Sequence, residues 1–581
     1  MLRRGLLLIS LALLGCVGAA SARLVAEPTA TDPLATGPSA VPPTTTAAAA
    51  TATRAVTTTA AATTTTAGTT TTAAVPAEST AAATLVFNGH GWGHGMGMSQ
   101  WGADGYAQHG WDYRQILAHY YQGTTVAAGP QPIVRVLLAS GRKRISLAST
   151  AAWQVTDANH TAVKLPAGPL QLGPGLVVSG KTLVSPLTFT SGSAPLELGA
   201  RAYRGKLLVL SDGKHLQVVN ALPLESYVLG VVGSEMPSTW PAAALEAQAV
   251  AARSYALAEL ENVVTARAFD VYADTRDQVY GGVAAESAPV TAAVQATAKQ
   301  IVLYGGKVAT TYFSSSSGGR TVSAAEALGK PIPYLVSVDD PYDTLSPYHD
   351  WGPVLVDARK AARALKVPGD LVALQPTPGP SGHVTQVDAV GSKGDVRLTG
   401  GDVRSVLGLR STWFTVGWLA LVPPAAAVPY GGAATLTGTV RGLTSVSLEQ
   451  RAPGGSWQTA GAVAPAADGS FSITVHPSGT TEYRLAAGGV LAGLVSVPVT
   501  PAVSASVATG AVQGSVKPAL AGAAVQLQRQ DGTGWTTVAT GKTDGAGSFA
   551  VAAQLAPGSY RVRCAPGHGL SPGVSQPILQ T

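Results

Sequence analysis

The chain has 581 residues, of which 46% are hydrophobic and only 12% are charged. This length predicts three or more domains, and the hydrophobic fraction is sufficient for several buried cores. The 38 basic and 32 acidic side chains give a net charge of +6, and no run of like charges is long enough to form a nucleic-acid-binding arm. Composition therefore excludes a single small domain, a collagen-like fibre and a wholly disordered chain.

The first residues have the pattern of a secretory signal peptide. Arg3 and Arg4 precede an apolar stretch at 6–17 that is too short to span a bilayer, and small residues at 20–22 form a cleavage site. We expect a signal peptide at 1–22 and a secreted protein without a transmembrane helix. A second interpretation is lipidation, because residues 13–16 resemble a lipoprotein box that ends at Cys16. After cleavage only Cys564 remains, which excludes an intramolecular disulfide and a multi-cysteine zinc site.

Residues 23–84 are predicted to be a disordered linker. From about residue 28 they are almost wholly Ala, Thr and Pro, and they contain no aromatic residue, so they cannot build a core. The linker is either an extended stalk with glycosylated threonines or a passive tether. The following segment, 85–421, mixes helical and strand patterns, and we predict an α+β domain there.

Glycine occupies every second position from 89 to 97. If this glycine ribbon is extended, the intervening side chains share one face and the bare face admits a second backbone or a flat ligand. Two interpretations stay open: the ribbon lines a sugar-binding groove, or it lets core segments pack tightly with Trp92 and Met96 buried. A metal site at His90 and His94 is less favoured, because no third ligand lies nearby and glycine-rich sequence is a poor helix former.

Two short helices are predicted after the ribbon. Ser99 is a suitable cap for a helix that extends through Ala107. Asp112 begins a second helix, with Gln115 at the capping-box position and Gly123 as its stop signal. Gln100 is therefore expected just beyond the end of the ribbon.

Glu235 follows an apolar run and precedes a predicted helix with Thr239 as cap and Pro241 in its first turn, extending to about Glu261. Burial at such a position favours the protonated carboxyl, as a general acid requires. The alternative is that Glu235 only complements the positive N-terminus of the following helix.

From residue 422 the pattern changes to short runs of Val, Leu and Thr broken by Gly and Asp, which predicts all-β sandwiches. Two copies are visible, because Trp457 and Phe471 recur 78 residues later as Trp535 and Phe549. This spacing suits one immunoglobulin-like sandwich at 422–500 and a second at 501–581. We expect these aromatic side chains in the two cores.

Several spaced motifs within 85–421 resemble the SpoIID/LytB family, named after stage II sporulation protein D. The motifs are Gly93-His94-Gly95-Met96-Gly97-Met98-Ser99-Gln100, Glu235-Met236-Pro237, Ala247-Gln248-Ala249 with Arg253-Ser254-Tyr255, Gln278-Val279-Tyr280, Ser315-Ser316-Ser317-Gly318-Gly319 and Leu407-Gly408-Leu409-Arg410-Ser411-Thr412.

This resemblance implies a lytic transglycosylase that acts on peptidoglycan glycan strands and needs no cofactor. The family's catalytic glutamate falls on Glu235, which would serve as the single general acid and base. It would protonate the glycosidic oxygen after N-acetylmuramic acid, then accept the proton of that sugar's C6 hydroxyl, leaving a 1,6-anhydro end. A second carboxylate at glycosidase spacing is then not required.

The resemblance also suggests the residues that line the groove. We expect these to be His94, Ser99, Gln100, Arg253, Gln278, Tyr280 and Ser317. Arg253 has an alternative role as a structural ion-pair partner, and Tyr280 as a wall of the core. Some relatives bind zinc through a cysteine in the stretch that matches 314–317, but this chain has only serines there, so no metal is expected.

One departure concerns the order of the motifs. In most members of the family the glycine ribbon follows the motif at 407–412, whereas here it precedes the whole domain, as if the chain were circularly permuted. A site survives such a change when the chain ends lie close together, as is common in compact domains.

Two further functional classes remain open. LytB-type relatives modify cell-wall amidases, so the domain would bind glycan and stimulate a partner amidase without cutting. The third class is a surface adhesin whose sandwiches make the contact. In each case peptidoglycan is the expected partner, the cell wall or surface is the expected location, and the sandwiches serve wall association or spacing.

Overall fold

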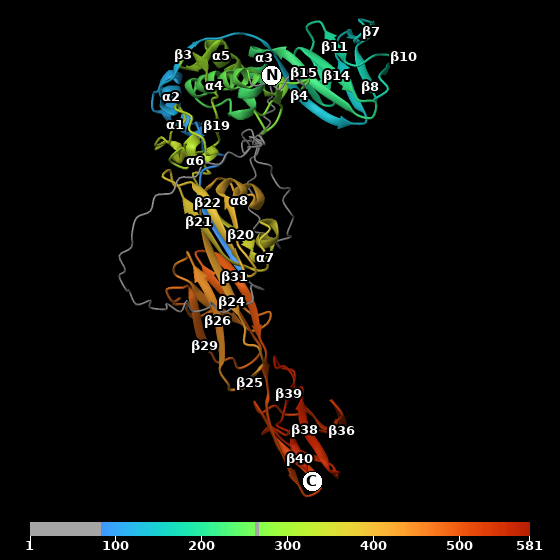
Figure 1. The fold of residues 1–581 in the computed structure, drawn as a ribbon. Coiled ribbons are helices and arrows are strands. Elements are labelled where there is room, and N and C mark those ends of the chain that lie inside the picture. The colour runs from blue at the N-terminus through green and yellow to red at the C-terminus, as the bar shows by residue number, and fades with distance from the viewer. Residues whose placement is uncertain (1–82, 262–266) are drawn as a thin grey trace, which may run out of the picture.

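The computed structural model describes residues 83–261 and 267–581. The predicted signal peptide, Cys16 and all of the predicted linker up to residue 82 lie outside the described residues. The described chain is elongated, with the α+β part at one end and the C-terminal strands at the other (Figure 1). Its buried hydrophobic side chains form four large clusters, called clusters 1 to 4 in chain order.

Cluster 1 spans Met96 to Leu335 and defines the N-terminal body. One half of this body is a β unit, at the upper right of Figure 1. Its strands are β4 (Ile133–Arg142), β5 (Ile145–Ser149), β6 (Trp153–Thr156), β7 (Ala162–Leu165), β8 (Gly168–Leu172), β11 (Leu187–Ser191), β12 (Leu196–Leu198), β13 (Arg201–Tyr203), β14 (Lys206–Ser211), β15 (Leu216–Pro223) and β16 (Val271–Tyr272). They form one sheet in the order β16-β4-β15-β14-β11-β6-β7 and a second in the order β13-β12-β5-β8.

The other half of the N-terminal body is helical. Its helices are α1 (Gln100–Gln108), α2 (Tyr113–Tyr120), α3 (Leu224–Glu235), α4 (Ala242–Glu261), α5 (Ala288–Ala296) and α6 (Ala324–Leu328). Helix α4 is buried along most of its length and packs against α1, α2, α3 and α5, because its many alanines allow close approach. Short strands complete this half: β2 (Met98–Ser99) pairs with β19 (Phe313–Ser314), and β17 (Gln300–Tyr304) lies between β3 (Thr125–Ala128) and β18 (Lys307–Val308).

The two helix starts predicted directly after the ribbon are confirmed. Ser99 is the N-cap of α1, and its hydroxyl accepts the backbone N–H of Gly102. Asp112 and Gln115 form the predicted capping box at the start of α2. These signals are local, which is why the sequence alone is sufficient to place them.

A five-stranded sheet connects the α+β part to the first C-terminal β unit. Its strands are β1 (Thr84–His90), β20 (Asp350–Asp357), β24 (Trp413–Val422), β26 (Ala434–Arg441) and β29 (Ser470–Val475), in the order β20-β1-β24-β26-β29. Alternate side chains of a strand point to opposite faces. Phe87 and Trp418 therefore lie in cluster 2, whereas Val86 and Leu419 lie in cluster 3. Strands β1 and β24 contribute to both clusters.

Cluster 2 defines the middle body, which covers one face of this sheet. It is built from α7 (Ala358–Ala364), α8 (Gly400–Leu407), β21 (Leu371–Pro378), β22 (Val384–Gly391) and β23 (Val396–Thr399). Figure 1 shows these elements beside β20, between the N-terminal body and the C-terminal strands. Together, the two bodies account for the α+β architecture predicted for 85–421.

The remaining chain is all β and forms two units, around clusters 3 and 4. The first unit adds β27 (Ser447–Arg451), β28 (Gln458–Ala462), β30 (Thr481–Ala487) and β31 (Val490–Val497); the second contains β33 (Ala502–Ala508), β34 (Ala511–Lys517), β35 (Ala524–Asp531), β36 (Gly534–Lys542), β37 (Ser548–Ala552), β38 (Gly558–Cys564), β39 (Gly573–Val574) and β40 (Ile578–Gln580). The repeat is visible in the register, because Leu448 pairs with Leu485 as Leu527 pairs with Val562. Immunoglobulin-like topology stays a prediction.

The predicted cores of the two units are only partly right. Phe471 and Phe549 are buried in clusters 3 and 4. Trp457 and Trp535 are half-buried outside the clusters, so their assignment to the core was wrong. The guanidinium carbons of Arg484 and Arg561 lie 4.0 and 4.2 Å from the respective ring centroids. Each tryptophan therefore forms a cation–π pair at the surface.

Candidate active site

The glycine ribbon is not extended beyond β1. Gly91, Gly93, Gly95 and Gly97 all have positive φ, at 76°, 113°, 72° and 73°. Glycine adopts this backbone region without steric cost, whereas other residues rarely enter it. The expectation of one shared side-chain face is therefore wrong, because every second residue turns the chain.

Tight packing explains why glycine occupies these positions. A Cβ atom on Gly97 would lie 2.0 Å from the carbonyl oxygen of Tyr312, and one on Gly91 would lie 2.7 Å from that of Ser316. Met96 is buried in cluster 1, while Trp92 is half-buried. The tight-packing interpretation is thus confirmed for Met96, and Trp92 keeps part of its surface exposed.

Glu235 is the last residue of α3, and only 8% of its surface is exposed. The backbone N–H of Val279 donates to its Oε1 at 2.8 Å, and the Gln100 Nε2 amide donates to its Oε2 at 3.2 Å. Gln100 directly follows the ribbon, so the structure brings the end of the ribbon and Glu235 into contact.

Glu235 precedes a helix, as expected, but that helix, α4, begins only at Ala242, later than the expected cap at Thr239. Glu235 itself ends α3, where the helix dipole presents its negative pole and disfavours a second negative charge. Complementing the dipole of the following helix therefore does not explain the residue.

Three buried glutamines belong to the segments that surround this carboxyl. Gln100 Nε2 is 3.5 Å from Gln248 Oε1, and Gln278 Nε2 donates to the Ala252 carbonyl of the same helix at 3.3 Å. Within the described part of the chain, Gln248 Nε2 and Gln278 Oε1 are buried without a hydrogen-bond partner. An unpaired buried polar group costs about 1–3 kcal/mol, and such groups in native sites indicate a missing water or ligand. Gln248 belongs to one of the family-like motifs but was not among the predicted groove residues.

Two further carboxyls lie along the same helix, and the sequence analysis missed both. The Tyr255 hydroxyl donates to Asp277 Oδ1 at 3.1 Å. Burial raises the pKa of Asp277 to about 6; burial and the nearby charge of Asp277 raise the pKa of Glu259 to about 7. Gln248, Tyr255 and Glu259 are spaced by seven and four residues, so they share one face of α4.

Trp101 and Trp240, which were not among the predicted site residues, come from the segments that carry Gln100 and Glu235. Trp101 follows Gln100, and Trp240 lies in the connection between α3 and α4. Their ring centroids are 4.8 Å apart at an interplanar angle of 61°, and both side chains are half-buried. A half-exposed aromatic pair next to buried polar groups is typical of a ligand-binding cleft.

Ser99 and Ser317 lie beneath this region in a buried polar network. The hydroxyls of Ser99 and Ser316 donate to Asp343 at 2.7 Å, and the Ser317 hydroxyl donates to Asp340 at 2.7 Å. Burial and the charge of Asp343 raise the pKa of Asp340 to about 7. Both predicted groove serines are only 1% exposed, so in this structure they position the backbone instead of facing solvent.

Arg253 and Tyr280 occupy the structural positions that were their alternatives. Arg253 is fully buried, and its Nε and Nη2 donate to Glu225 at 3.0 and 2.9 Å. Its Nη1 donates to the Gln300 carbonyl at 2.8 Å. Tyr280 is 2% exposed and donates its hydroxyl to Asn220 Oδ1 at 2.8 Å. Placing these two side chains on the groove surface therefore disagrees with the structure.

His94 also lies outside the hydrogen-bond network of Glu235. Burial, with the nearby charge of Arg404, lowers the pKa of His94 to about 4, so the ring is neutral at physiological pH. Its Nδ1 accepts the backbone N–H of Met96 at 3.0 Å, and its ring centroid is 6.0 Å from that of Tyr312. Of the seven predicted groove residues, Gln100 contacts Glu235, and Gln278 precedes the backbone donor Val279.

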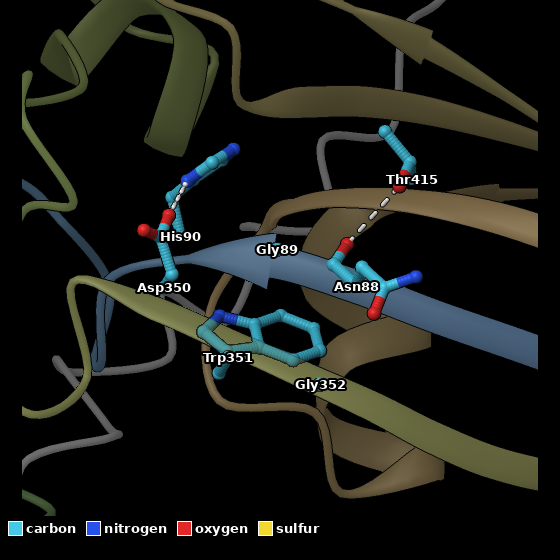
Figure 2. A pocket seen from close by; sticks show the side chains of 7 residues that line it. All are labelled: Asn88, Gly89, His90, Asp350, Trp351, Gly352 and Thr415. Atoms are coloured by element: carbon cyan, nitrogen blue, oxygen red, sulfur yellow. Dashed lines mark hydrogen bonds and ion pairs between the residues drawn. The ribbon is translucent and has the colours of Figure 1, made fainter. Parts of the chain in front are cut away.

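A separate pocket of about 300 Å³ opens on the sheet formed by β1, β20 and β24 (Figure 2). It is lined by Asn88, Gly89, His90, Asp350, Trp351, Gly352 and Thr415. Figure 2 shows His90 turned toward Asp350, with Nδ1 and Oδ1 2.6 Å apart. Neither Glu235 nor a predicted groove residue lines this pocket, so it is distinct from the candidate site.

Neither a metal-ligand cluster nor a membrane-spanning helix is found among the described residues. No group of three or more His, Cys, Asp or Glu side chains in 83–261 and 267–581 is arranged to hold a metal ion. Over the same ranges, no helix has the length and apolar character needed to cross a membrane.

Comparison with known proteins supports the importance of the region around Glu235. The model of the SpoIID family, described as stage II sporulation protein, matches residues 212–304. This match contains α3 and α4, and with them Glu235, Gln248 and Gln278, but it does not extend to the glycine ribbon.

Three curated proteins are similar to parts of the chain. An uncharacterised protein of Brachyspira hyodysenteriae is 43% identical over 136 residues, 23% of this chain and 37% of that protein. Stage II sporulation protein D of Bacillus subtilis is 32% identical over 213 residues, 34% of this chain and 61% of that protein. The amidase enhancer of Bacillus subtilis is 36% identical over 114 residues, 20% of this chain and 15% of that protein. The chain thus matches less than two thirds of the length of each relative.

Proposed function

Because the chain belongs to the SpoIID/LytB family through the region matched above, we propose that it is a secreted peptidoglycan lytic transglycosylase with Glu235 as its single general acid and base. The substrate is the glycan strand, cut after N-acetylmuramic acid. The two C-terminal β units serve wall association or spacing. No cofactor takes part in the proposed chemistry.

In the proposed reaction, one carboxyl carries both proton transfers. Protonated Glu235 donates to the glycosidic oxygen while the bond from that oxygen to C1 of the muramic residue breaks. The C6 hydroxyl of the same sugar then bonds to C1 and passes its proton to the Glu235 carboxylate. The acid is regenerated, the product ends in a 1,6-anhydro ring, and no water is consumed. General acid–base catalysis of this kind contributes about 10²–10⁴-fold to a rate.

The contact between Gln100 and Glu235 is the observation that carries this proposal. It joins the two most distinctive motifs of the sequence, which are 135 residues apart in the chain. Burial excludes water from the carboxyl, and the donors Val279 N–H and Gln100 Nε2 fix its orientation. A single oriented and sheltered carboxyl is what an intramolecular ring closure requires.

The decisive experiment is product analysis on the purified protein. We expect the protein alone to release anhydro-ended fragments from peptidoglycan, detected by mass, and Glu235→Gln to reduce the release at least about 100-fold. The matched control is Glu261→Gln, the same change at the exposed end of α4, which should keep full activity. Unchanged release by a folded Glu235→Gln variant would disprove the assignment.

A second candidate function is suggested by the similarity to the amidase enhancer of Bacillus subtilis. In this alternative, the protein binds glycan and stimulates a cell-wall amidase without cutting the strand. The wild type would then release no anhydro ends by itself but would accelerate a purified amidase, and Glu235→Gln would stimulate equally well. Anhydro products from the wild type without amidase would reject this alternative.

A further inference from the structure

Two aromatic rings contact the positive charge of Arg410, and the three residues come from three separate segments. Trp92 belongs to the ribbon, Tyr348 precedes β20, and Arg410 lies between α8 and β24. The ring centroids of Trp92 and Tyr348 are 4.0 Å apart at an interplanar angle of 88°. The guanidinium carbon of Arg410 lies 4.6 Å from the Trp92 centroid and 4.8 Å from that of Tyr348. All three side chains are half-buried.

Backbone hydrogen bonds fix these three segments against one another. Gly93 N–H donates to the Arg410 carbonyl at 3.0 Å, and Gly91 N–H donates to the His349 carbonyl at 3.0 Å. Trp92 and Ser316 exchange two further backbone bonds, at 2.8 and 3.0 Å. The positions of Trp92, Tyr348 and Arg410 are therefore set before any ligand arrives, as a preorganised binding site requires.

The guanidinium of Arg410 has no counter-ion among the residues that the structure describes. Asp343, a buried carboxylate of the network, already accepts from Ser99, Ser316 and His349. Arginine stays charged at any physiological pH, and its planar fork binds a carboxylate through two parallel hydrogen bonds. Contact with two aromatic rings orients the plane of that fork.

Backbone hydrogen bonds connect the segment of Trp92 to the segment that carries Gln100. Trp92 N–H donates to the carbonyl of Ser316, and Trp101 N–H donates to the carbonyl of the preceding residue, Ser315. The backbones of Trp92 and Trp101 therefore lie on opposite sides of the segment at 315–316. Two strand spacings correspond to a separation of about 10 Å between them. Trp101 in turn follows Gln100, the residue in contact with Glu235. One extended oligosaccharide is long enough to reach both places.

We propose that Trp92, Tyr348 and Arg410 form a subsite for a carboxylate-bearing sugar, with Arg410 binding the carboxylate through its fork. This inference rests on the proposed function and gives it a recognition element. In an alternating glycan strand from which the stem peptides have been removed, the muramic residues carry a free carboxyl group on their lactyl ether, whereas the N-acetylglucosamine residues carry none. The subsite would thus set the register of the strand relative to Glu235.

The test compares two ligands that differ in the charge of their carboxyl groups. They are the tetrasaccharide of alternating N-acetylglucosamine and N-acetylmuramic acid with free carboxylates, and the same tetrasaccharide with its carboxyls methyl-esterified. Calorimetric titration of the full chain carrying Glu235→Gln avoids cleavage during the measurement. Loss of a charge-assisted pair is expected to weaken binding of the ester about 10- to 100-fold. Raising the ionic strength should weaken binding of the free acid more than that of the ester.

Variants then assign the effect to one residue. Arg410→Gln should bind acid and ester equally, and Arg410→Lys, which keeps the charge but loses the fork, should give an intermediate preference. The matched control is Arg359→Gln, which removes one exposed charge on α7 and should keep the full preference. Equal binding of acid and ester by the parent protein, no binding of either, or an unchanged preference in Arg410→Gln would each overturn the subsite. The ligand comparison needs no variant at Arg410, so it stands even if Arg410→Gln does not fold.

The outcome is independent of the catalytic proposal. A preference for the acid together with no anhydro products from the wild type would reject the transglycosylase and keep the subsite. Anhydro products together with equal binding of acid and ester would reject the subsite and keep the enzyme.

Discussion

At the scale of single residues, the candidate site contains more polar groups than the protein itself satisfies. Gln248 Nε2 is an unpaired donor, and Gln278 Oε1 is an unpaired acceptor. The Gln278 side chain donates to the carbonyl of Ala252, which lies about one turn of α4 after Gln248. Each of the two groups costs about 1–3 kcal/mol while it stays unpaired. Gln248 contacts Gln100, and Gln278 precedes Val279, so both residues are linked to the two hydrogen-bond donors of Glu235. Such an arrangement favours occupation by a group that can both accept and donate hydrogen bonds.

The buried Asp340 makes the stability of the protein depend on pH. Its pKa is raised from 3.8 to about 7, so the folded state binds a proton more tightly than the unfolded state. The free energy of unfolding is therefore expected to fall as the pH rises from about 4 to about 7. Denaturant unfolding across this range should show a smaller decline for Asp340→Asn than for the wild type. An identical pH dependence in both proteins would contradict the raised pKa.

The chemistry of individual residues was only partly predictable from the sequence. Glu235 and Gln100 were selected through family motifs, and nothing in the local pattern of either one predicts a contact across 135 residues. Arg253 was expected at the groove because the family resemblance suggested it. The sequence does not show that Glu225, on the neighbouring helix α3, accepts two hydrogen bonds from the Arg253 guanidinium. Gln248 was missed because a glutamine in an alanine-rich helix has no distinguishing periodicity.

At the scale of elements, the glycine ribbon combines close packing with left-handed backbone, and the two effects can be separated experimentally. Gly97 has φ 73° and faces the Tyr312 carbonyl, whereas Gly110 has φ 85° and open space where a Cβ would lie. Both alanine variants carry the same backbone strain, of order 1–2 kcal/mol. Gly97→Ala is expected to lose at least about 1–3 kcal/mol more of the free energy of unfolding, through overpacking. Thermal unfolding of the two variants gives the comparison, and equal losses would show that packing plays no part.

The elements differ in how far the sequence determines them. The caps of α1 and α2 depend on side chains within three residues, and both were predicted correctly. The ribbon was expected to be extended because alternation is the signature of a strand, but glycine alternation carries no information on the sign of φ. Trp457 and Trp535 were assigned to cores by their apolar character. Arginines on neighbouring strands, which the sequence does not place, hold them at the surface instead.

At the scale of the whole molecule, the sheet shared by clusters 2 and 3 determines where the chain can be shortened. Truncation after residue 422 would remove β26 from its place beside β24 and expose Val86, Leu419 and Leu421. Truncation after residue 500 keeps cluster 3 covered. We therefore expect the chain ending at 500 to unfold near the temperature of the full protein, and the chain ending at 422 to unfold at a lower temperature or aggregate. Equal melting of both truncated chains in calorimetry would show that the β units are independent.

The start of the glycine ribbon lies beside a motif that is distant in the sequence. His90 pairs with Trp413 in the register of β1 and β24, and the Ser411 hydroxyl donates to the His90 carbonyl. The ribbon thus begins beside the motif at 407–412, although 321 residues separate Ser411 from His90 along the chain. This contact in space is what the predicted circular permutation requires.

This arrangement has a consequence for biosynthesis. Strand β1 is among the first folded segments to leave the ribosome, yet its partners β20 and β24 are among the last parts of the α+β region to be made. Until they arrive, β1 is an unpaired apolar strand, and neither the middle body nor the first β unit can close. These two cores can therefore close only after β24 has been synthesised, whereas cluster 1, which contains no residue of β1, does not depend on that step.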